Sequence, residues 1–365
     1  MKMNFFIPNM NYNMNFTPMG VINTPYNPII NYSQINGINN PSFFNSTLQA
    51  FASINIIYMW INKWANNANI LFSSQNFKIT KELYNLFYAL YTRQNLDSSN
   101  FILNYFNKLK LLNLNPNENV DNPIAFLYYL IQLIHYENNY PQNPNQNWNS
   151  YNNLPLFKRI NDIEVRNIFF SLLKQIDNSI ISQNFYSIIK CETRCNRCSI
   201  QYSYGYKYMI KFYVDDYIKH RNTCTPWKTN YGLNLDECFE CYTGGYPCIC
   251  GMCKNNQAIS YTSFINFPKV LILALIRKKH TYFGDIDFKY NLNVNGYTQK
   301  GSFQFPNYLL KAVVSMNKQG QFFADISMYN NWYRYFGNQV SQLSNQNINF
   351  ILKTFEPQLL IYESC

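Results

Sequence analysis

The first half of the chain carries apolar side chains at helical spacing. Phe44, Leu48 and Phe51 recur at intervals of three and four residues, which predicts a helix with one buried face. The polar stretch 143–153 interrupts this pattern and favours a long loop. The same helical period predicts further helices near 81–92, 101–112, 123–135 and 162–175.

The second half changes to the two-residue period of strands. Tyr202, Tyr204 and Tyr206 alternate with other residues, and residues 270–276 form an unbroken apolar run that is typical of a strand buried on both faces. Further strands are expected at 308–315, 322–328 and 358–362. Helices first and an antiparallel sheet later, with a cysteine-rich excursion between them, predict an α+β fold.

Composition adds limits to this picture. The 365 residues include 29 Phe and 32 Tyr, which is enough apolar material for one large multi-lobed domain or two domains. Only 13% of the residues are charged, so amide and hydroxyl side chains must supply much of the polar surface. The abundance of Asn indicates a compositional bias of the source rather than a function.

The formal net charge of +11 suits an acidic partner. The Lys and Arg residues are scattered, however, and the densest runs (277–279 and 219–221) are short, so nucleic-acid binding is only weakly supported. No stretch has the ~20 apolar residues of a membrane span, and the first residues lack the pattern of a signal or transit peptide. A cytoplasmic or nuclear location is therefore expected.

The cysteines are clustered rather than spread along the chain. Nine of the 10 lie between Cys191 and Cys253, which favours metal ligands over a disulfide framework. Two CxxC turns, Cys195–Cys198 and Cys250–Cys253, lie about 50 residues apart. Each turn places two thiolates on one side of a loop, so Cys195, Cys198, Cys250 and Cys253 are predicted to hold one structural Zn²⁺ in a closed tetrahedral shell.

The remaining cysteines leave two alternatives. Cys238 and Cys241 form a third CxxC, which could complete a second metal site with Cys191, Cys224 or Cys248. Cys238 could equally be a small core residue.

Several short motifs resemble the ubiquitin-specific protease (ubiquitin carboxyl-terminal hydrolase) family, in that family's order. Residues 37–49 (GINNPSFFNSTLQ) resemble its cysteine box, with Asn45 to Gln49 fitting best. The two CxxC turns lie where the family carries its finger-tip zinc site. The other matching segments are Asn161-Asp162, 267–277, 308–314, 320–324, 332–335 and 359–362.

The resemblance implies a papain-like cysteine peptidase fold with thumb, palm and zinc-bearing fingers. The implied thumb covers about 37–185, the fingers about 186–266 and the palm about 267–365. Residues 1–36 show no clear period and are expected to form an irregular tail or to dock on a partner.

The residues at the implied catalytic positions cannot perform the family's chemistry. The nucleophile position falls on Ser42, which needs an adjacent base. The base position falls on Gln321, which accepts no proton at neutral pH, and the orienting position falls on Phe336. The box is also shortened before Pro41, so the oxyanion Asn has no secure counterpart; Asn39 or Asn40 could stand in.

The sequence therefore predicts a degenerate family member without peptidase activity. The histidines His135, His220 and His280 are not well placed to substitute for the base. The first hypothesis is a scaffold subunit of a protein complex. The alternatives are a ubiquitin or ubiquitin-like binding module, a hydrolase with unusual or residual activity through Ser42, and an RNA-associated scaffold.

Two residues are candidates for binding a ubiquitin tail. Asp162 matches the family's tail-contacting Asp, although a lone Asp before a helix is often an N-cap. Phe322 either lines the tail channel or fills a collapsed cleft.

Overall fold

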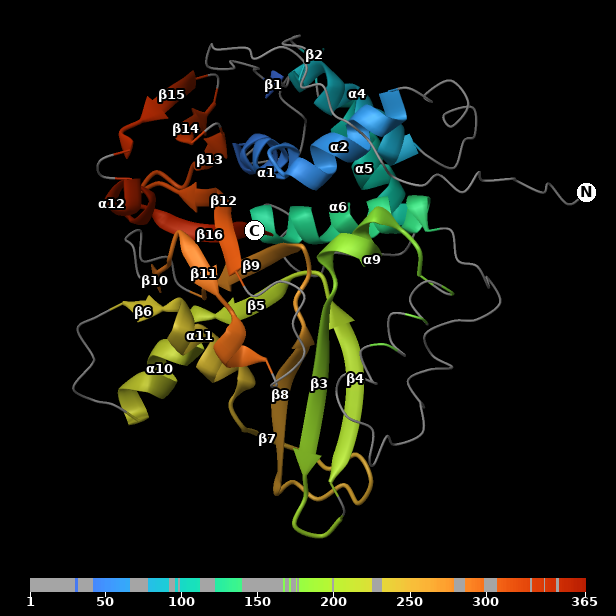
Figure 1. Ribbon diagram of the computed structural model, residues 1–365, viewed down its shortest axis with the longest axis vertical. Coiled ribbons are helices and arrows are strands. Elements are labelled where there is room, and N and C mark those ends of the chain that lie inside the picture. The colour runs from blue at the N-terminus through green and yellow to red at the C-terminus, as the bar shows by residue number, and fades with distance from the viewer. Residues whose placement is uncertain are drawn as a thin grey trace, which may run out of the picture.

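The protein consists of a helical upper part, a broad sheet and a second sheet that extends away from both (Figure 1). Of the expected tail at 1–36, only Ile30 and Asn31 are described; they form strand β1, which pairs in parallel with β2 (Leu96–Asp97). The computed structural model describes residues 30–31, 42–65, 78–91, 96–97, 99–111, 122–139, 167, 171, 175, 177–198, 200–224, 232–278, 286–298, 307–328, 330–337, 339–345 and 348–365.

The helical part surrounds one central helix, α1. Every residue of α1 from Phe43 to Ala52 is buried, the polar ones between Asn45 and Gln49 included, so the helix is enclosed on all sides. Helix α6 (Pro123–Asn138) is capped by Asn122, whose side-chain oxygen accepts a 2.7 Å hydrogen bond from the backbone N–H of Ala125. Pro123 occupies the first helical position. The helices are α1 (Ser42–Ala52), α2 (Asn55–Ala65), α4 (Lys78–Tyr91), α5 (Ser99–Leu111), α6 (Pro123–Asn138) and α9 (Ile180–Phe185).

A four-stranded antiparallel sheet reaches away from the rest of the molecule (Figure 1). Its strands lie in the order β4-β3-β8-β7, and the long β3 and β8 form its centre. The cysteine pairs are carried at the far end of this sheet, beyond the last paired residues of β3 and before the first of β8. The strands are β3 (Ser187–Arg194), β4 (Gln201–Lys207), β7 (Tyr246–Cys248) and β8 (Ala258–Asn266).

The broad sheet has the order β15-β14-β13-β12-β16-β9-β5, with β11 (Asn291–Asn293) added beside β12. Its pairs are antiparallel except β5 with β9, which is parallel. Strand β16 therefore lies in the interior of the sheet, between β12 and β9. The strands are β5 (Ile210–Tyr213), β9 (Val270–Ile276), β12 (Asn307–Met316), β13 (Phe322–Met328), β14 (Asn331–Phe336), β15 (Gln339–Leu343) and β16 (Glu356–Ser364).

This sheet separates two hydrophobic cores. On β9, Ile272 and Ala274 face the core shared with α1 and α6, whereas Leu271 and Leu273 face a second core on the other side. The apolar run predicted at 270–276 is thus confirmed as a strand buried on both faces. The second core is covered by elements that the sequence pattern had not indicated: α10 (Val214–Cys224), α11 (Leu235–Thr243), η3 (Asn295–Tyr297), α12 (Ile348–Lys353), and the pair β6 (Leu233–Asn234) and β10 (Ile286–Asp287).

The α+β prediction is confirmed, and the helices expected near 81–92, 101–112 and 123–135 are present as α4, α5 and α6. The helix expected at 162–175 lies outside the described residues apart from 167, 171 and 175, each of which is helical. Strand β5 and helices α10 and α11 belong to the broad sheet and its second core, although they fall within the range expected for the fingers. None of the described helices is long and apolar enough to cross a membrane.

Candidate catalytic slot and metal centre

The predicted nucleophile position lies where the helical part meets the broad sheet. Ser42 is the first residue of α1, and its Oγ accepts a hydrogen bond of 2.9 Å from the backbone N–H of Phe322, 280 positions along the chain. Helix α1 packs against β13, so the start of the helix lies beside the start of the strand. The fold therefore places Ser42 next to the predicted base position, Gln321.

Gln321 is held by the turn that precedes it. The turn contains Gly320 in a left-handed conformation (φ 75°), and Asn317 organises it by accepting hydrogen bonds from the backbone N–H groups of Gln319 and Gln321. The Asn317 amide also donates to Gln321 Oε1 at 3.2 Å. The side chain at the base position is thus an exposed amide that is hydrogen-bonded to another amide.

The predicted orienting position belongs to an aromatic and ionic cluster on the other face of the sheet. The ring of Phe336 lies 6.3 Å from that of Phe323, edge to face. The guanidinium of Arg334 lies 4.4 Å from the Phe323 ring and makes two 2.8 Å hydrogen bonds to buried Asp325. Burial raises the pKa of Asp325, and Arg334 opposes this shift. Strand alternation places Phe336 opposite to Tyr335, which faces the core around α1.

Phe322 contributes to packing at the catalytic slot, which comprises Ser42 at the start of α1 and the adjoining Gln321 and Phe322 at the start of β13. Its side chain is 6% exposed, and its ring lies 6.5 Å from that of Phe43 at 82°. Both rings belong to the core shared by the helices and the sheet. Of the two alternatives for Phe322, its position is that of a core residue; its role in binding a ubiquitin tail stays a prediction. Asp162, Asn39, Asn40 and His280 lie outside the described residues.

The described histidines lie elsewhere. His135 is near the end of α6, about 13 Å along the helix from Phe126, which contacts Phe43. Its Nε2 lies 2.8 Å from Asp177 Oδ1 and its Nδ1 lies 2.7 Å from Ser179 Oγ. His220 is on α10, which packs on the second core.

This Ser–His–Asp series superficially resembles a hydrolase triad. Ser179 is 3% exposed and caps α9, accepting a hydrogen bond from the Ser182 N–H at 3.1 Å. Asp177 is equally buried. A nucleophile that is closed off from solvent and committed to a helix cap reaches no substrate, so the series serves to join α6 to α9.

The four predicted metal ligands come together at the tip of the four-stranded sheet. The sulfur atoms of Cys195, Cys198, Cys250 and Cys253 all lie within 4.8 Å of one another. The Cys195 and Cys253 sulfurs are 3.6 Å apart, close to the ~3.8 Å that a tetrahedral zinc–sulfur distance of about 2.3 Å requires. The four are therefore close enough to bind one metal ion.

The sulfur cluster favours a thiolate on one of its members. Backbone N–H groups, that of Cys253 first, and the Gln201 amide lower the pKa of Cys250 to about 6. The hydrogen bond with Cys253 has the opposite effect on Cys198 and raises its pKa to about 12. A ready thiolate at buried Cys250 suits a metal ligand.

A second metal site finds no support in the part of the chain that the structure describes. Cys195, Cys198, Cys250 and Cys253 are the one group of potential ligands brought together there. Cys238 is fully buried in the second core, as the alternative interpretation expected. The Cys191 sulfur lies 3.9 Å from the Thr262 hydroxyl, and the Cys224 side chain is not among those described.

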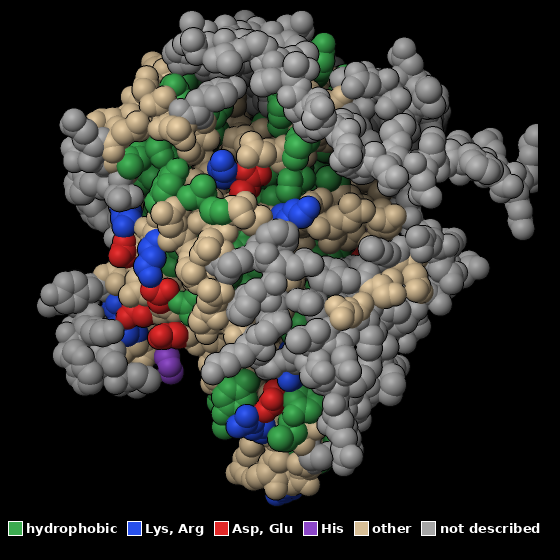
Figure 2. All heavy atoms as spheres, in the orientation of Figure 1, with side chains coloured by type: hydrophobic (Ala, Val, Ile, Leu, Met, Phe, Trp, Pro, Cys, Tyr) green, Lys and Arg blue, Asp and Glu red, His purple; other side chains and the backbone are tan. Residues whose placement is uncertain are grey.

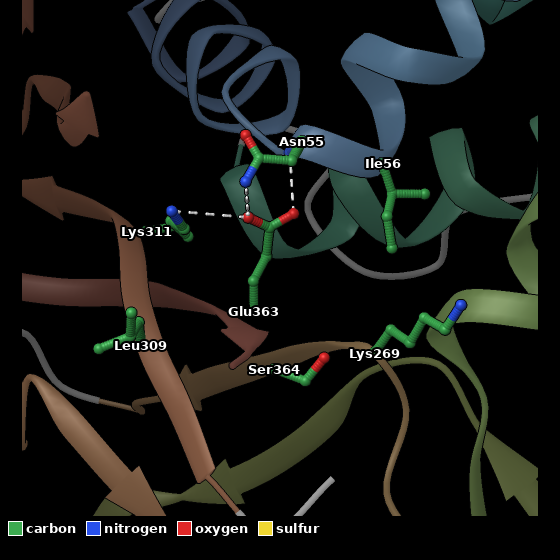
Figure 3. A pocket seen from close by; sticks show the side chains of 7 residues that line it. All are labelled: Asn55, Ile56, Lys269, Leu309, Lys311, Glu363 and Ser364. Carbon is green, nitrogen blue, oxygen red and sulfur yellow. Dashed lines mark hydrogen bonds and ion pairs between the residues drawn. The ribbon is translucent and has the colours of Figure 1, made fainter. Parts of the chain in front are cut away.

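An open cavity of about 200 Å³ lies at the other end of β12 from Ser42 (Figure 3). Its main polar group is the buried carboxylate of Glu363, which accepts hydrogen bonds from the Asn55 N–H at 2.8 Å and the Asn55 amide at 2.9 Å. Burial raises the pKa of Glu363. The Lys311 ammonium lies 3.8 Å away, at a bulge in β12. These contacts fasten α2 to the sheet. The lining consists of Asn55, Ile56, Lys269, Leu309, Lys311, Glu363 and Ser364.

Charged side chains are mixed on the face shown in Figure 2, where Lys and Arg are interspersed with Asp and Glu. The described residues on this face form no extended basic stripe of the kind that tracks a nucleic-acid backbone.

Comparison with known proteins gives consistent results. The family model described as "Ubiquitin carboxyl-terminal hydrolase" matches residues 34–362. Among solved structures, a chain of the SAGA Ubp8/Sgf11/Sus1/Sgf73 DUB module has a TM-score of 0.61 and 19% identity, covering 91% of this chain and 69% of that one. A chain of the yeast SAGA DUB module has a TM-score of 0.59 and 17% identity, covering 91% and 68%.

The same module bound to monoubiquitin contains a chain with a TM-score of 0.60 and 17% identity, covering 93% and 69%. At these identities the likeness concerns the fold. No curated protein sequence matches the chain significantly.

Proposed function

Because the chain belongs to the ubiquitin carboxyl-terminal hydrolase family, we propose that it is a member without peptidase activity that acts as a structural subunit of a protein complex. One observation carries this proposal. At the position of the nucleophile, Ser42 Oγ accepts the Phe322 N–H, and the adjacent position of the base is Gln321. Neither Ser42 nor Gln321 has a side chain that can take a proton at neutral pH.

The chemistry requires three roles that these residues cannot fill. A serine hydroxyl must lose its proton to a base within hydrogen-bond reach, and an amide side chain does not serve as that base. The base must itself be oriented by a hydrogen-bond acceptor, and Phe336 has none. In a well-studied serine protease, losing the nucleophile or the base costs about 10⁶ in kcat.

The four cysteines at the tip of the four-stranded sheet (the fingertip) suit zinc in a structural role. Four cysteine sulfurs form a soft donor set with tetrahedral spacing, and four thiolates leave no open position for substrate or water. When bound, Zn²⁺ supplies a cross-link between the two CxxC turns. This role needs no catalytic activity and suits a protein that is maintained for its shape.

The scaffold role draws support from the similar structures. The Ubp8 structures are of a module with Sgf11, Sus1 and Sgf73, so a fold of this kind works within an assembly. A nuclear or cytoplasmic location remains part of the proposal. Nucleic acid is the less favoured partner, because the charges on the face in Figure 2 are mixed.

A second candidate function is ubiquitin binding without turnover. It is favoured by the complexes of the similar module with monoubiquitin and with ubiquitin aldehyde. Burial of Phe322 weighs against an open tail channel at that residue. Asp162 is the remaining candidate contact, and it provides the test of this alternative.

The first experiment measures hydrolysis of a fluorogenic ubiquitin amide by wild type, by Ser42→Ala and by Ser42→Cys/Gln321→His/Phe336→Asp. We expect wild type and Ser42→Ala to show the same background rate. Turnover by wild type that Ser42→Ala abolishes would instead establish the residual hydrolase. Activity in the triple variant would show that the slot is open and lacks only its side chains.

The second experiment titrates wild type with ubiquitin by calorimetry. The scaffold proposal expects no saturable binding up to near-millimolar ubiquitin. Saturable binding that Asp162→Arg abolishes would make the protein a ubiquitin-binding module. Gel filtration of the complex purified from native cells then tests the scaffold role: a stoichiometric assembly supports it, and a monomer refutes it.

A further inference from the structure

Amide side chains surround the metal centre and join its two halves. The first CxxC turn lies between β3 and β4, and the second lies between β7 and β8. The two turns belong to different hairpins, which are joined by the pairing of β3 with β8 as far as Arg194 and Ile259. Beyond that last pair, four Asn and Gln residues make contacts between the two turns: Gln201, Asn196, Asn255 and Gln257.

Gln201 makes the most direct of these contacts. It is the first residue of β4, and its Nε2 donates a 3.0 Å hydrogen bond to the sulfur of Cys250, which belongs to the other hairpin. Cys250 is the fully buried member of the four cysteines. A Cβ on Gly251 would lie 3.4 Å from Gln201 Oε1, so the Gln201 side chain lies directly against the second turn.

A chain of amide hydrogen bonds forms the second link. Asn255 Nδ2 donates to Asn196 Oδ1 at 2.7 Å, and Asn196 Nδ2 donates to Gln257 Oε1 at 3.0 Å. The backbone continues the link, because the Cys250 N–H donates to the Asn255 carbonyl at 2.7 Å. Asn196 lies between the first two ligands, and Asn255 follows the last one.

These contacts have a chemical consequence for a bound metal. A divalent ion held by four thiolates leaves a net charge of about −2 on the cluster, and N–H donors to sulfur disperse that charge. Donors outside the ligand shell also fix the direction of the sulfur lone pairs. Their removal typically weakens metal binding about 10- to 100-fold.

We propose that Gln201 is a positioning residue for the metal: its amide N–H holds the Cys250 sulfur in the geometry for binding, while the Asn196–Asn255–Gln257 bridge sets the spacing of the two turns. The proposal rests on the assignment of a structural zinc in the preceding section. It goes beyond that assignment because Gln201 is not a ligand and belongs to no motif of the cysteines.

The test uses the full chain and measures affinity for Zn²⁺ by competition with a chromophoric chelator. Gln201→Met keeps the length of the side chain and removes the donor, and Gln201→Glu replaces the donor with a negative charge. Gln342→Met is the matched control, because Gln342 is exposed on β15 and bonds Asn331 there. Cobalt substitution reports the geometry of the sulfurs through the sulfur-to-metal absorption bands.

We expect Gln201→Met to weaken zinc binding about 10-fold or more, Gln201→Glu to weaken it further, and Gln342→Met to leave it unchanged. The cobalt bands should shift in both Gln201 variants. Asn196→Ala should also weaken binding, and it keeps the test decisive if a Gln201 variant fails to fold.

Two results would overturn the inference, and they are distinguishable. Wild-type zinc binding with an affinity unchanged within threefold in Gln201→Met and Asn196→Ala refutes the role of the amides alone. A wild-type chain that binds neither zinc nor cobalt refutes the zinc assignment as well.

Discussion

The slot at Ser42 and the fingertip at Cys250 are opposite cases within one chain. At the fingertip, the four side chains have the chemistry of a metal centre, and their sulfurs lie within 4.8 Å of one another. At the slot, Ser42 and Phe322 meet across 280 positions, but the side chains there are a hydroxyl, an amide and phenyl rings. The fold brings the four cysteines together and places Ser42 beside Phe322, but it places Phe336 in a cluster on the other face of the sheet.

The difference lies in what each site contributes to the fold. A bound metal would cross-link the two CxxC turns beyond the last β3–β8 pair, Arg194 with Ile259, so the cysteines would then have a structural role. At the slot, Phe43 and Phe322 supply packing to the main core, and neither contact depends on a nucleophile. The contacts observed at the slot are therefore contacts of core packing.

Loss of a metal ligand should have the largest effect. Cys253→Ser should abolish binding of one metal ion and remove the cross-link that it makes between the two turns, because three thiolates no longer close the tetrahedral shell. Metal analysis and hydrogen exchange across 194–201 and 246–258 measure this. Cys365→Ser is the control, since Cys365 is exposed and outside the cluster. Unchanged metal content in Cys253→Ser would show that the four cysteines do not form the metal site.

Truncation of the slot's aromatic packing should come next. Phe322→Ala is expected to lower the free energy of unfolding by about 3–5 kcal/mol, because it leaves a cavity against Phe43. Urea denaturation measures the change, and Phe322→Leu should lose less. A loss below about 1 kcal/mol would mean that the ring lines an open channel, which would favour the ubiquitin-binding alternative.

Lowering the pH should have opposite effects on the buried carboxyl groups and on the metal centre. Burial raises the pKa of Glu137, Asp325 and Glu363, so their contribution to stability is fully present below the unfolded values near 4 and is lost as pH rises through the folded values. Metal binding has the opposite dependence, because acid protonates the thiolates.

With metal chelated, the melting temperature should therefore fall less between pH 7 and pH 5 than it does with metal bound. Glu363→Gln removes one of the three carboxyl groups and should reduce their part of the pH dependence. If Glu363→Gln and wild type show the same change of melting temperature with pH, the Glu363 carboxyl contributes nothing to the pH dependence of stability.

Removal of the Ser42 hydroxyl should have the smallest effect. Ser42→Ala deletes one acceptor for the Phe322 N–H and should cost about 1 kcal/mol in the free energy of unfolding. Urea denaturation of Ser42→Ala beside Ser42→Cys measures it. A loss of several kcal/mol would show that the hydroxyl matters more to the fold than one hydrogen bond.

Much of the architecture follows from local patterns. The apolar run at 270–276 predicts a strand with two buried faces, because both the helical part and the second core require apolar partners there. The Asn-Pro pair at 122–123 similarly marks the start of α6. The sequence does not predict α10 and α11, because cysteines spaced as between 224 and 248 are typical of turns, whereas Cys238 and Phe239 are core residues of a helix.

The sites were less accessible to sequence reasoning. The CxxC spacing predicts directly which four cysteines come close enough to bind a metal ion, since each turn is local. The meeting of Ser42 with Phe322 depends on a helix and a hairpin far apart in the chain, and only the resemblance of the motifs suggested it. The contact of Gln201 with Cys250 could not be predicted from the sequence. One amide in an amide-rich sequence is indistinguishable from its neighbours, and only the fold places Gln201 beside Cys250.

The position of β16 has a consequence for how the protein is made. This strand lies between β12 and β9, yet it comes after both in the chain. A ribosome that has released only the residues before Glu356 has therefore exposed two apolar strands with a gap between them, and neither core can close. Chaperones would meet an intermediate with unpaired strand edges until synthesis passes Ser364. Truncation anywhere within β16 should accordingly abolish soluble expression, although it removes no residue of the slot or of the metal centre.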